Sequence, residues 1–240
     1  MNKVALIDAD SLLYKGEEDL TVYMDRIEEI FNNILHVSKA DHYKIFIESP
    51  KNYTFRKIMN KTYKINRKNT TLPVNYHEIK KHIIETYDPA IAVGIESDDY
   101  IISTYKYLKE NHPLTEIVIC ANDKDYLTYP IQYMDLYYGR MYQVKKISEK
   151  EAMYNFAIQM LMGDGVDGVK CLSGVGEKTA KKLIKNCNSK LDYLRVIWRE
   201  YRKQYKHKTL AKQALHNNFL MLKIRDDVKF VEEFIPINQE

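Results

Sequence analysis

The sequence predicts an α/β protein with a mainly parallel central sheet flanked by helices, followed by a helical C-terminal region. Short apolar runs alternate with helical patterns in the first part of the chain, which is typical of an α/β domain. After Ser148 the pattern is wholly helical, with one glycine-rich interruption at residues 163–176. With 240 residues, 45% of them hydrophobic, the chain is long enough for one large domain or two small ones.

Five short apolar runs supply the predicted strands, at residues 3–7, 44–47, 91–95, 116–120 and 134–138. Runs of this length with few polar residues are typical of strands that are buried on both faces of a parallel sheet. The stretch 20–37 places its apolar residues on one helical stripe, and 100–108 has the same spacing. Strands and helices therefore alternate along the chain.

Acidic residues close four of these strands, at Asp8-Ala9-Asp10, Glu48, Glu96-Ser97-Asp98-Asp99 and Asn122-Asp123-Lys124-Asp125. The carboxyl ends of parallel strands meet at one edge of an open sheet, so we expect these side chains to converge there. Like charges at close range require either raised pKa values or bound cations. Carboxylates without accompanying His or Cys point to a hard cation such as Mg²⁺ or Mn²⁺.

The glycine-rich interruption of the helical region adds two further acids. Asp164 and Asp167 lie in the sequence GDGVDG, where closely spaced glycines end a helix and permit close approach of the backbone to another group. One interpretation places both carboxylates near the strand-end acids. The alternative is a structural turn in which the aspartates cap backbone N–H groups.

Further along, Gly174 and Gly176 form a tight turn into a helix whose first N–H groups are free to bind a phosphate. Lys178, Lys181 and Lys182 lie opposite the apolar face of that helix. A phosphate-binding helix and a merely solvated lysine face both fit this pattern.

Residues 53–69 (YTFRKIMNKTYKINRKN) are rich in Lys and Arg, contain no acid, and include three aromatic side chains. Basic residues neutralise backbone phosphates and aromatic rings stack on unpaired bases, so the segment suits single-stranded nucleic acid. The alternative is a basic helix whose aromatic side chains lie in the core.

Composition excludes several classes of protein. No apolar run approaches the roughly 20 residues that a bilayer span needs, and we expect no secretory signal and no membrane partner. The three cysteines have no metal-binding or disulfide spacing, which favours a reducing cytoplasm. Lys and Arg number 37 against 33 acids. Setting aside the ten clustered acids leaves 23 acids against 37 basic residues, a net charge of +14, and predicts salt-dependent DNA binding.

Taken in order, the motifs resemble those of the phage 5′→3′ exonucleases and flap endonucleases, which are related to the 5′-nuclease domain of bacterial DNA polymerase I. The resemblance covers roughly residues 4–228. It runs through LIDAD, FIES, YKINRK, ESDD, NDKDY and GDGVDGVKCLSGVGEKTA.

The resemblance implies two divalent metal ions, Mg²⁺ or Mn²⁺, surrounded by nine acids: Asp8, Glu48, Glu96, Asp98, Asp99, Asp123, Asp125, Asp164 and Asp167. Asp8 and Asp125, with Lys64 and Arg67 at the reacting phosphate, form the implied catalytic group. Tyr63 is implied to stack on the terminal base. The turn at Gly174–Gly176 is implied to be a duplex-binding helix–turn–helix with a bound K⁺. The remaining implied DNA contacts are Arg56, Lys68, Lys178, Thr179, Lys181 and Lys182.

The sequence departs from the family pattern at the first two acidic motifs. Glu48 stands where the family usually has Asp, and its longer side chain could shift one metal. Ala9 replaces the usual Gly, and Asp10 is an additional acid. Since no ligand is lost, we expect activity.

The expected organisation is a metal-dependent α/β nuclease core at 1–150, with a basic arch segment at about 50–72, and a helical duplex-DNA-binding region at 151–240. We expect the protein to be a monomeric, structure-specific 5′ nuclease that acts on DNA 5′ ends, flaps or RNA primers. Its expected role is primer removal or DNA degradation. A PIN-type ribonuclease and a catalytically silent DNA-structure binder are the alternatives.

Overall fold

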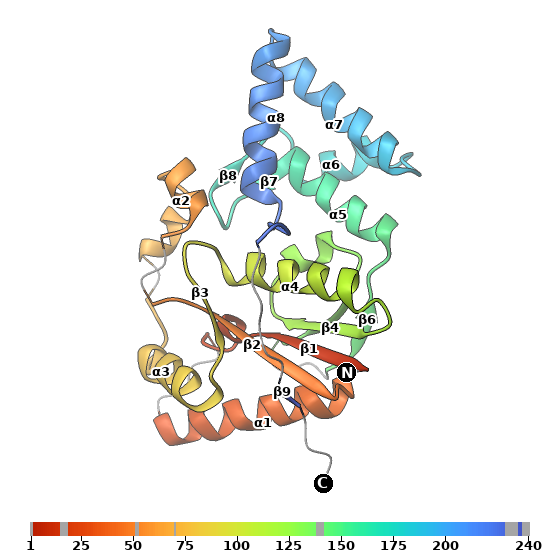
Figure 1. The fold of residues 1–240 in the computed structure, drawn as a ribbon. Coiled ribbons are helices and arrows are strands. Elements are labelled where there is room, and N and C mark those ends of the chain that lie inside the picture. Colours follow the sequence, from red (N-terminus) through yellow and green to blue (C-terminus); the bar gives the residue numbers. More distant parts are fainter. Residues whose placement is uncertain are drawn as a thin grey trace.

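A computed structural model gives the architecture of the protein (Figure 1). It describes residues 2–14, 19–50, 53–69, 71–137, 142–228 and 235–236, with the side chains of residues 68, 69, 235 and 236 excepted. Among the described residues, no helix has both the length and the apolar character that crossing a bilayer requires.

A mixed sheet forms the centre of the N-terminal part, in the order β3-β2-β1-β4-β5-β6. The first five strands in this order run parallel to one another, and β6 is antiparallel to β5. A short strand, β9, pairs antiparallel with β2. The strands are β1 (Lys3–Asp8), β2 (His42–Glu48), β3 (Ala90–Ala92), β4 (Glu116–Ala121), β5 (Gln132–Asp135), β6 (Val144–Lys146) and β9 (Ile235–Pro236).

Strand β1 lies between β2 and β4, and its residues from Val4 to Asp8 are all buried. The chain adds strands first on one side of β1 and later on the other. The sheet therefore has its topological switch point beside β1, where ligand crevices of open α/β sheets lie. Asp8 is the last residue of β1 and stands at this point.

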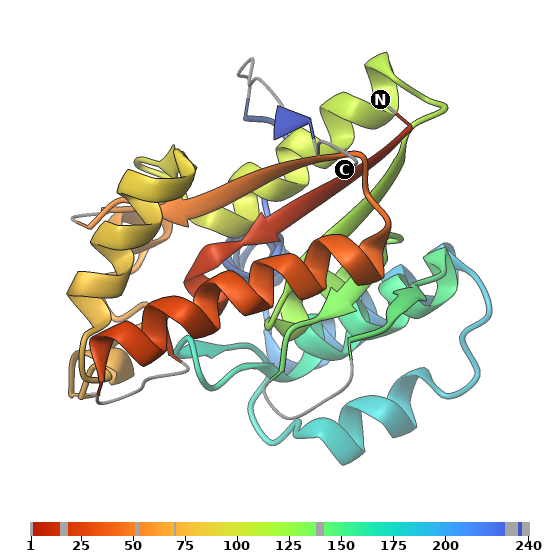
Figure 2. The same cartoon turned by 90° about the horizontal axis from the view of Figure 1, so that it is seen from below.

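Helices cover both faces of the sheet. Helices α1 (Leu20–Ser38) and α3 (Tyr76–Tyr87) pack on the face that receives Ala5 and Ile7. Helix α4 (Ser97–Asn111) packs on the opposite face, which receives Val4 and Leu6. In the view of Figure 2, α1 runs nearly along the direction of β1 and β2. Because successive side chains of a strand alternate between faces, Asp8 points to the α4 side.

The C-terminal helices form a third hydrophobic core, in the upper part of Figure 1. They are α5 (Glu149–Met162), α6 (Glu177–Ile184), α7 (Lys190–Gln204) and α8 (Lys208–Leu222). A two-stranded ribbon, β7 (Gly163–Asp164) with β8 (Val169–Lys170), follows α5. Helix α5 contacts the sheet domain through Asn155, whose Nδ2 donates to the carbonyl of Leu127 at 2.9 Å. The domain boundary near residue 150 stays a prediction.

The predicted fold class is confirmed, with differences in individual elements. Strand β3 ends at Ala92 rather than at residue 95, because Gly94 turns the backbone at φ +74° ahead of α4. Strand β5 begins at Gln132 and ends at Asp135, and part of the predicted run 134–138 lies outside the described residues. The basic segment contains a short helix, α2 (Phe55–Met59), and a 3₁₀ turn at Ile65–Asn69.

Gly163 provides a test of this packing, because it ends α5 at φ +86°. A Cβ atom there would lie 2.2 Å from the carbonyl oxygen of Val169. We expect Gly163→Ala to lower the free energy of unfolding by roughly 2–4 kcal/mol, measured by urea denaturation. Gly165→Ala is the matched control, since its Cβ meets no atom within 4 Å, and it should change stability by less than about 1 kcal/mol. Equal effects of the two variants would contradict the close approach.

Candidate metal centre

The strand-end acids come together at the carboxyl edge of the sheet. Asp8 ends β1, Glu48 ends β2, and Glu96 immediately precedes α4. Asp8 Oδ1 accepts a hydrogen bond from Ser97 Oγ at 3.4 Å, which joins the end of β1 to the start of α4. Asp123 follows β4 and lies near enough to raise the pKa of Asp8 electrostatically.

Asp8 is buried, and its hydrogen-bond donors among the described residues are uncharged. Ser11 Oγ and Tyr126 OH donate to Oδ2 at 3.2 and 3.3 Å, and the Asp10 N–H donates to Oδ1 at 3.2 Å. Burial, followed by the charges of Asp10 and Asp123, raises the pKa of Asp8 to about 8. Among the described residues no basic side chain pairs with Asp8, so ionisation of this carboxyl group is disfavoured unless a cation is added.

Asp10 connects the ends of β1 and β2. Its Oδ2 accepts the Glu48 N–H at 2.6 Å, and its Oδ1 lies 3.2 Å from Nζ of the buried Lys80 on α3. Burial, together with the charges of Asp10 and Glu96, raises the pKa of Glu48 to about 7. The additional acid of the LIDAD motif thus fixes the backbone of the second strand-end acid.

Three acids lie together at the start of α4. Carboxylate oxygens of Glu96, Asp98 and Asp99 lie within 4.8 Å of one another. Glu96 and Asp99 form a capping box, in which each side chain accepts a backbone N–H from the other end of the first turn. Burial, and then the charge of Asp99, raises the pKa of Asp98 well above its usual value.

Arg56 of α2 closes this group from the side of the basic segment. Its Nη1 and Nη2 each lie 2.8 Å from an oxygen of Asp99, and Nη1 also donates to Glu96 at 2.9 Å. Its remaining N–H groups donate to the carbonyls of Met221 and Lys223. Arg56 is 2% exposed. The prediction that Arg56 contacts DNA is therefore wrong, because all of its donors face protein acceptors.

The same contacts change the interpretation of Asp99, one of the nine implied metal ligands. Both of its oxygens accept from Arg56, and Oδ1 also accepts the Arg225 N–H at 2.7 Å. A cation could bind Asp99 only by displacing the guanidinium. Asp98, on the preceding position of the helix, has no such bidentate partner in the part of the chain that the structure describes and is better suited as a ligand.

Tyr63 is also placed differently from its implied role. Its ring is 5% exposed and belongs to the core of the C-terminal helices. Its hydroxyl donates to Glu96 at 2.9 Å and to Asp167 at 3.0 Å. Stacking of this ring on a terminal base is excluded in this arrangement. The alternative interpretation, in which aromatic residues of the basic segment lie in the core, holds for Tyr63.

Lys64 and Arg67 do reach the acidic site. Lys64 Nζ lies 2.7 Å from Glu96 Oε1 and 3.9 Å from Asp167, and Arg67 Nη2 lies 2.6 Å from Asp167 Oδ1. The Arg67 side chain is 48% exposed, so its guanidinium also faces solvent. Burial opposes the charge of Lys64, but Glu96 and Asp167 outweigh it and raise its pKa.

Asp123 and Asp125 form a second acidic group, in the turn that follows β4. Asp123 accepts the Asp125 N–H at 2.9 Å, and Asp125 accepts from Gln159 Nε2 on α5. Burial, and then the charge of Asp123, raises the pKa of Asp125 to about 7. The Oε1 of Gln159 is buried and has no hydrogen-bond partner among the described residues.

Asp164 and Asp167 join this second group through the ribbon after α5. Asp164 accepts the Val166 and Asp167 N–H groups at 2.8 and 3.3 Å, which is the turn-capping arrangement that the sequence left open. It also pairs with Lys124 Nζ at 2.5 Å. Burial raises the pKa of Asp164, but this pair and the turn N–H groups outweigh it and leave the pKa lowered.

The turn into α6 presents its basic residues to solvent. Gly174 has φ +73°, and α6 begins after Gly176. Lys178, Thr179, Lys181 and Lys182 are exposed, with Lys181 paired to Glu177 at 2.6 Å. Their contact with DNA, and K⁺ at the turn, stay predictions. The side chain of Lys68 lies outside the described residues.

The donor set fits hard divalent cations. Asp8, Glu48 and Asp125 all have pKa values raised by burial and by neighbouring carboxylates, so ionising them together requires added positive charge. The unpartnered Gln159 Oε1 beside Asp125 is a further oxygen without a donor. Oxygen ligands alone favour Mg²⁺ or Mn²⁺.

Several residues that organise the site were not identified from the sequence. Lys80 and Gln159 each contact a site carboxylate, but they lie in ordinary helical sequence that carries no local signal. Ser97 and Tyr126 also contact Asp8, and both stand within the acidic motifs ESDD and NDKDY. Lys124 had a signal, because it stands between two aspartates in NDKDY.

Solved structures share this fold. A bacteriophage T5 5′-exonuclease with bound zinc aligns with a TM-score of 0.65 at 15% identity, over 92% of this chain and 89% of that one. A bacteriophage T5 flap endonuclease in a complex with DNA and metal ions aligns with a TM-score of 0.65 at 15% identity, over 93% and 89%. A T5 protein co-crystallised with metal ions aligns with a TM-score of 0.61 at 15% identity, over 93% and 90%.

No model of a known protein family matches the sequence, and no curated protein matches it. The fold that the motif order implied is thus the fold of these phage nuclease structures. At 15% identity the likeness concerns the fold.

The Arg56 contacts generate a stability prediction. Arg56→Met leaves Glu96 and Asp99 buried without their guanidinium, so we expect the free energy of unfolding to fall by about 3–5 kcal/mol. Urea denaturation measures this loss. Lys61→Met, which removes an exposed charge from the same segment, should change it by less than about 0.5 kcal/mol. A loss below about 1 kcal/mol for Arg56→Met would mean that the pairing is not maintained in solution.

The raised pKa values generate a pH prediction for the metal-free protein. Acids with raised folded-state pKa values stabilise the fold below the unfolded pKa, near 4, and lose that contribution as the pH rises through about 7 to 8. With EDTA, we therefore expect the Tm to fall between pH 5 and pH 8.

Added Mg²⁺ should oppose this loss, because a cation binds the ionised carboxylates. At about 100 times its Kd it contributes roughly 2.7 kcal/mol, or about 5–10 °C in Tm, with the larger effect at pH 8 than at pH 5. Differential scanning fluorimetry with Mg²⁺ or EDTA at the two pH values measures both effects. A Tm independent of Mg²⁺ at pH 8 would rule out a cation site at these acids.

Proposed function

We propose that the protein is a metal-dependent 5′ nuclease that hydrolyses DNA phosphodiesters, with two divalent cations at the carboxyl edge of the sheet. The observation that carries the proposal is the buried carboxylate of Asp8. It lies among other acids with uncharged hydrogen-bond donors, at the switch point of a fold shared with phage 5′-exonuclease structures.

The proposed ligands are Asp8, Glu48, Asp98, Asp123 and Asp125. Three further acids are already paired with basic side chains: Glu96 with Lys64, Asp164 with Lys124 and Asp167 with Arg67. Bound divalent cations supply an activated water at neutral pH and stabilise the charge that develops on the phosphate and the leaving 3′-oxygen.

Lys64 and Arg67 hold positive charge where the scissile phosphate would lie. Glu96 positions Lys64, and Asp167 positions Arg67. Each basic side chain would contact both its acid and the substrate phosphate. Preorganised cations of this kind stabilise a developing phosphoryl charge without reorganisation during the reaction. Tyr63 and Tyr126 act behind them, since their hydroxyls orient Glu96, Asp167 and Asp8.

Substrate binding is proposed to involve residues 151–240 together with the basic surface. The exposed lysines of α6 and the turn at Gly174–Gly176 offer donors and positive charge to a duplex backbone, and K⁺ at the turn would add to them. The proposed substrates are DNA 5′ ends, flaps or RNA primers, cleaved by the protein as a monomer. Residues 1–150 supply the catalytic core.

Substitution of the central acid tests the proposal. Asp8→Asn should lower the rate of Mg²⁺-dependent cleavage of a 5′-labelled flap and of a recessed duplex by at least about 100-fold. The reason is that the variant removes a negative charge at the position where the protein provides no compensating cation. Initial rates with Mg²⁺, and with EDTA as a blank, measure the effect.

Asp88→Asn is the matched control, because Asp88 is an exposed residue at the end of α3 and the chemical change is the same. It should cleave at the rate of the unsubstituted protein. Failure of the unsubstituted protein to yield a Mg²⁺-dependent product from either DNA would remove the nuclease proposal and favour a DNA-structure binder. Cleavage of RNA strands alone would favour the ribonuclease.

A further inference from the structure

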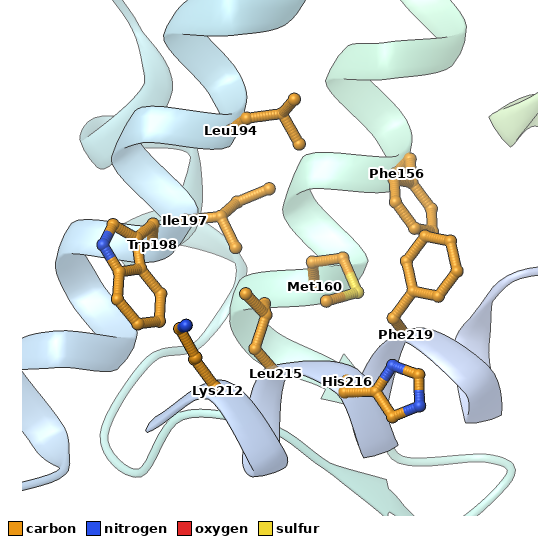
Figure 3. Close-up of a pocket in the computed structure, with 9 residues that line it drawn as sticks. All are labelled: Phe156, Met160, Leu194, Ile197, Trp198, Lys212, Leu215, His216 and Phe219. Atoms are coloured by element: carbon orange, nitrogen blue, oxygen red, sulfur yellow. The ribbon is translucent and has the colours of Figure 1, made fainter. Parts of the chain in front are cut away.

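A hydrophobic pocket lies between α5, α7 and α8, among the C-terminal helices (Figure 3). Its volume is about 420 Å³, within the roughly 300–1,000 Å³ range of ligand sites. Seven apolar or aromatic side chains line it, together with Lys212 and His216 and no acid. The apolar lining is Phe156, Met160, Leu194, Ile197, Trp198, Leu215 and Phe219.

The apolar lining comes from side chains at helical spacing on α7 and α8, together with two residues of α5. Leu194, Ile197 and Trp198 are spaced by three and four residues on α7, and Leu215 and Phe219 by four on α8. Figure 3 shows side chains from the three helices converging on one space. Leu194 is 45% exposed and Phe219 38% exposed, so apolar surface remains accessible in the described structure.

A groove adjoins this pocket. Its volume is about 730 Å³, and it shares Phe156, Leu194 and Phe219 with the pocket. The remainder of its lining mixes apolar side chains with charged ones of both signs, among them Lys150, Lys190, Glu149 and Asp226. The accessible apolar surface thus continues from the pocket into the groove.

The helical hairpin that forms the pocket is strongly basic. Residues 190–222 contain eight Lys or Arg against two acids, Asp192 and Glu200. Both acids are engaged locally, Asp192 by the capping box with Ser189 and Glu200 by Arg199 and Lys203. Arg202 adds a guanidinium 6.0 Å from the ring centroid of Trp198.

We propose that this pocket is a docking site for an acidic amphipathic segment of a partner protein. Bulky apolar side chains of the segment would fill the space between α5, α7 and α8, and its carboxylates would face Lys212 and the basic hairpin. This is the arrangement of helix-in-groove recognition, with apolar anchors supplying affinity and charge supplying orientation and association rate.

The chemistry of the lining favours a protein segment over nucleic acid. A phosphate backbone needs hydrogen-bond donors and cations along its path, and most of the lining supplies neither. Insertion of an unpaired base among the aromatic side chains is the competing possibility, and it is an outcome of the test.

The pocket lies on a different face of α5 from the acidic site. Gln159 contacts Asp125, whereas Phe156 and Met160 face the pocket. A ligand can therefore occupy the pocket without touching the proposed metal ligands. The proposal stands independently of the nuclease activity.

Trp198 provides a direct reporter, because it is the single tryptophan of the chain and lines the pocket. The probe is a synthetic peptide with Phe and Leu at helical i, i+3, i+4 and i+7 positions and Glu elsewhere, titrated into the full-length protein in EDTA. We expect a saturable change in Trp198 fluorescence, with an affinity that falls as salt is added. The same peptide with Lys in place of Glu should give no saturable change.

Matched variants locate the binding surface. Leu194→Glu should weaken peptide binding at least about tenfold, whereas Leu191→Glu, on the same helix but outside the pocket and 53% exposed, should change it by less than about twofold. Lys212→Glu should also weaken binding, and Lys106→Glu, at an exposed position of α4 outside the hairpin, is its control with the same change of charge. Thermal unfolding of each variant confirms that it folds.

Other outcomes overturn the proposal. These are the absence of a saturable change with the acidic peptide, equal effects of Leu194→Glu and Leu191→Glu, or a saturable change with an oligothymidine that the peptide fails to reproduce. Peptide binding is measured through Trp198 fluorescence in EDTA, without DNA or Mg²⁺, so a loss of docking is distinguished from a loss of nuclease activity.

Discussion

The concentration of carboxylates at one edge of a parallel sheet is the constraint on which the rest of this structure depends. Parallel strands bring Asp8 and Glu48 to the same edge, and the start of α4 adds Glu96, Asp98 and Asp99. Such a cluster can persist in a folded chain only if some charges are paired and others are suppressed or compensated. The protein does both, since Arg56 and Lys64 pair with Glu96, while burial raises the pKa of Asp8.

The basic segment between β2 and α3 has a structural task as well as a proposed chemical one. Arg56 connects α2 to the start of α4 and to the carbonyls of Met221 in α8 and Lys223 just after it, so it joins three parts of the chain that are distant in sequence. Arg67 reaches solvent from the same segment. Arg56 and Arg67 thus have the same local sequence signal but different positions. Arg56 is buried and paired with acids, whereas Arg67 faces both the site and solvent.

Helix α5 relates the acidic site to the pocket of the C-terminal helices. Gln159 contacts Asp125 and Asn155 contacts the carbonyl of Leu127, both in the turn after β4. Phe156 and Met160 line the pocket on another face. This arrangement separates the proposed chemistry from the proposed docking surface, although one rigid helix carries residues of both.

The sequence by itself determined the fold class and the convergence of acids, because strand periodicity and strand-end carboxylates are local signals and parallel pairing gives all strand ends one edge. It also indicated Lys64 and Arg67 within one basic segment. Only the tertiary structure decided that Arg56 and Tyr63 are buried and that Lys80 and Lys124 pair with acids. Burial and pairing depend on which distant side chains come into contact, and no local pattern of residues encodes those contacts.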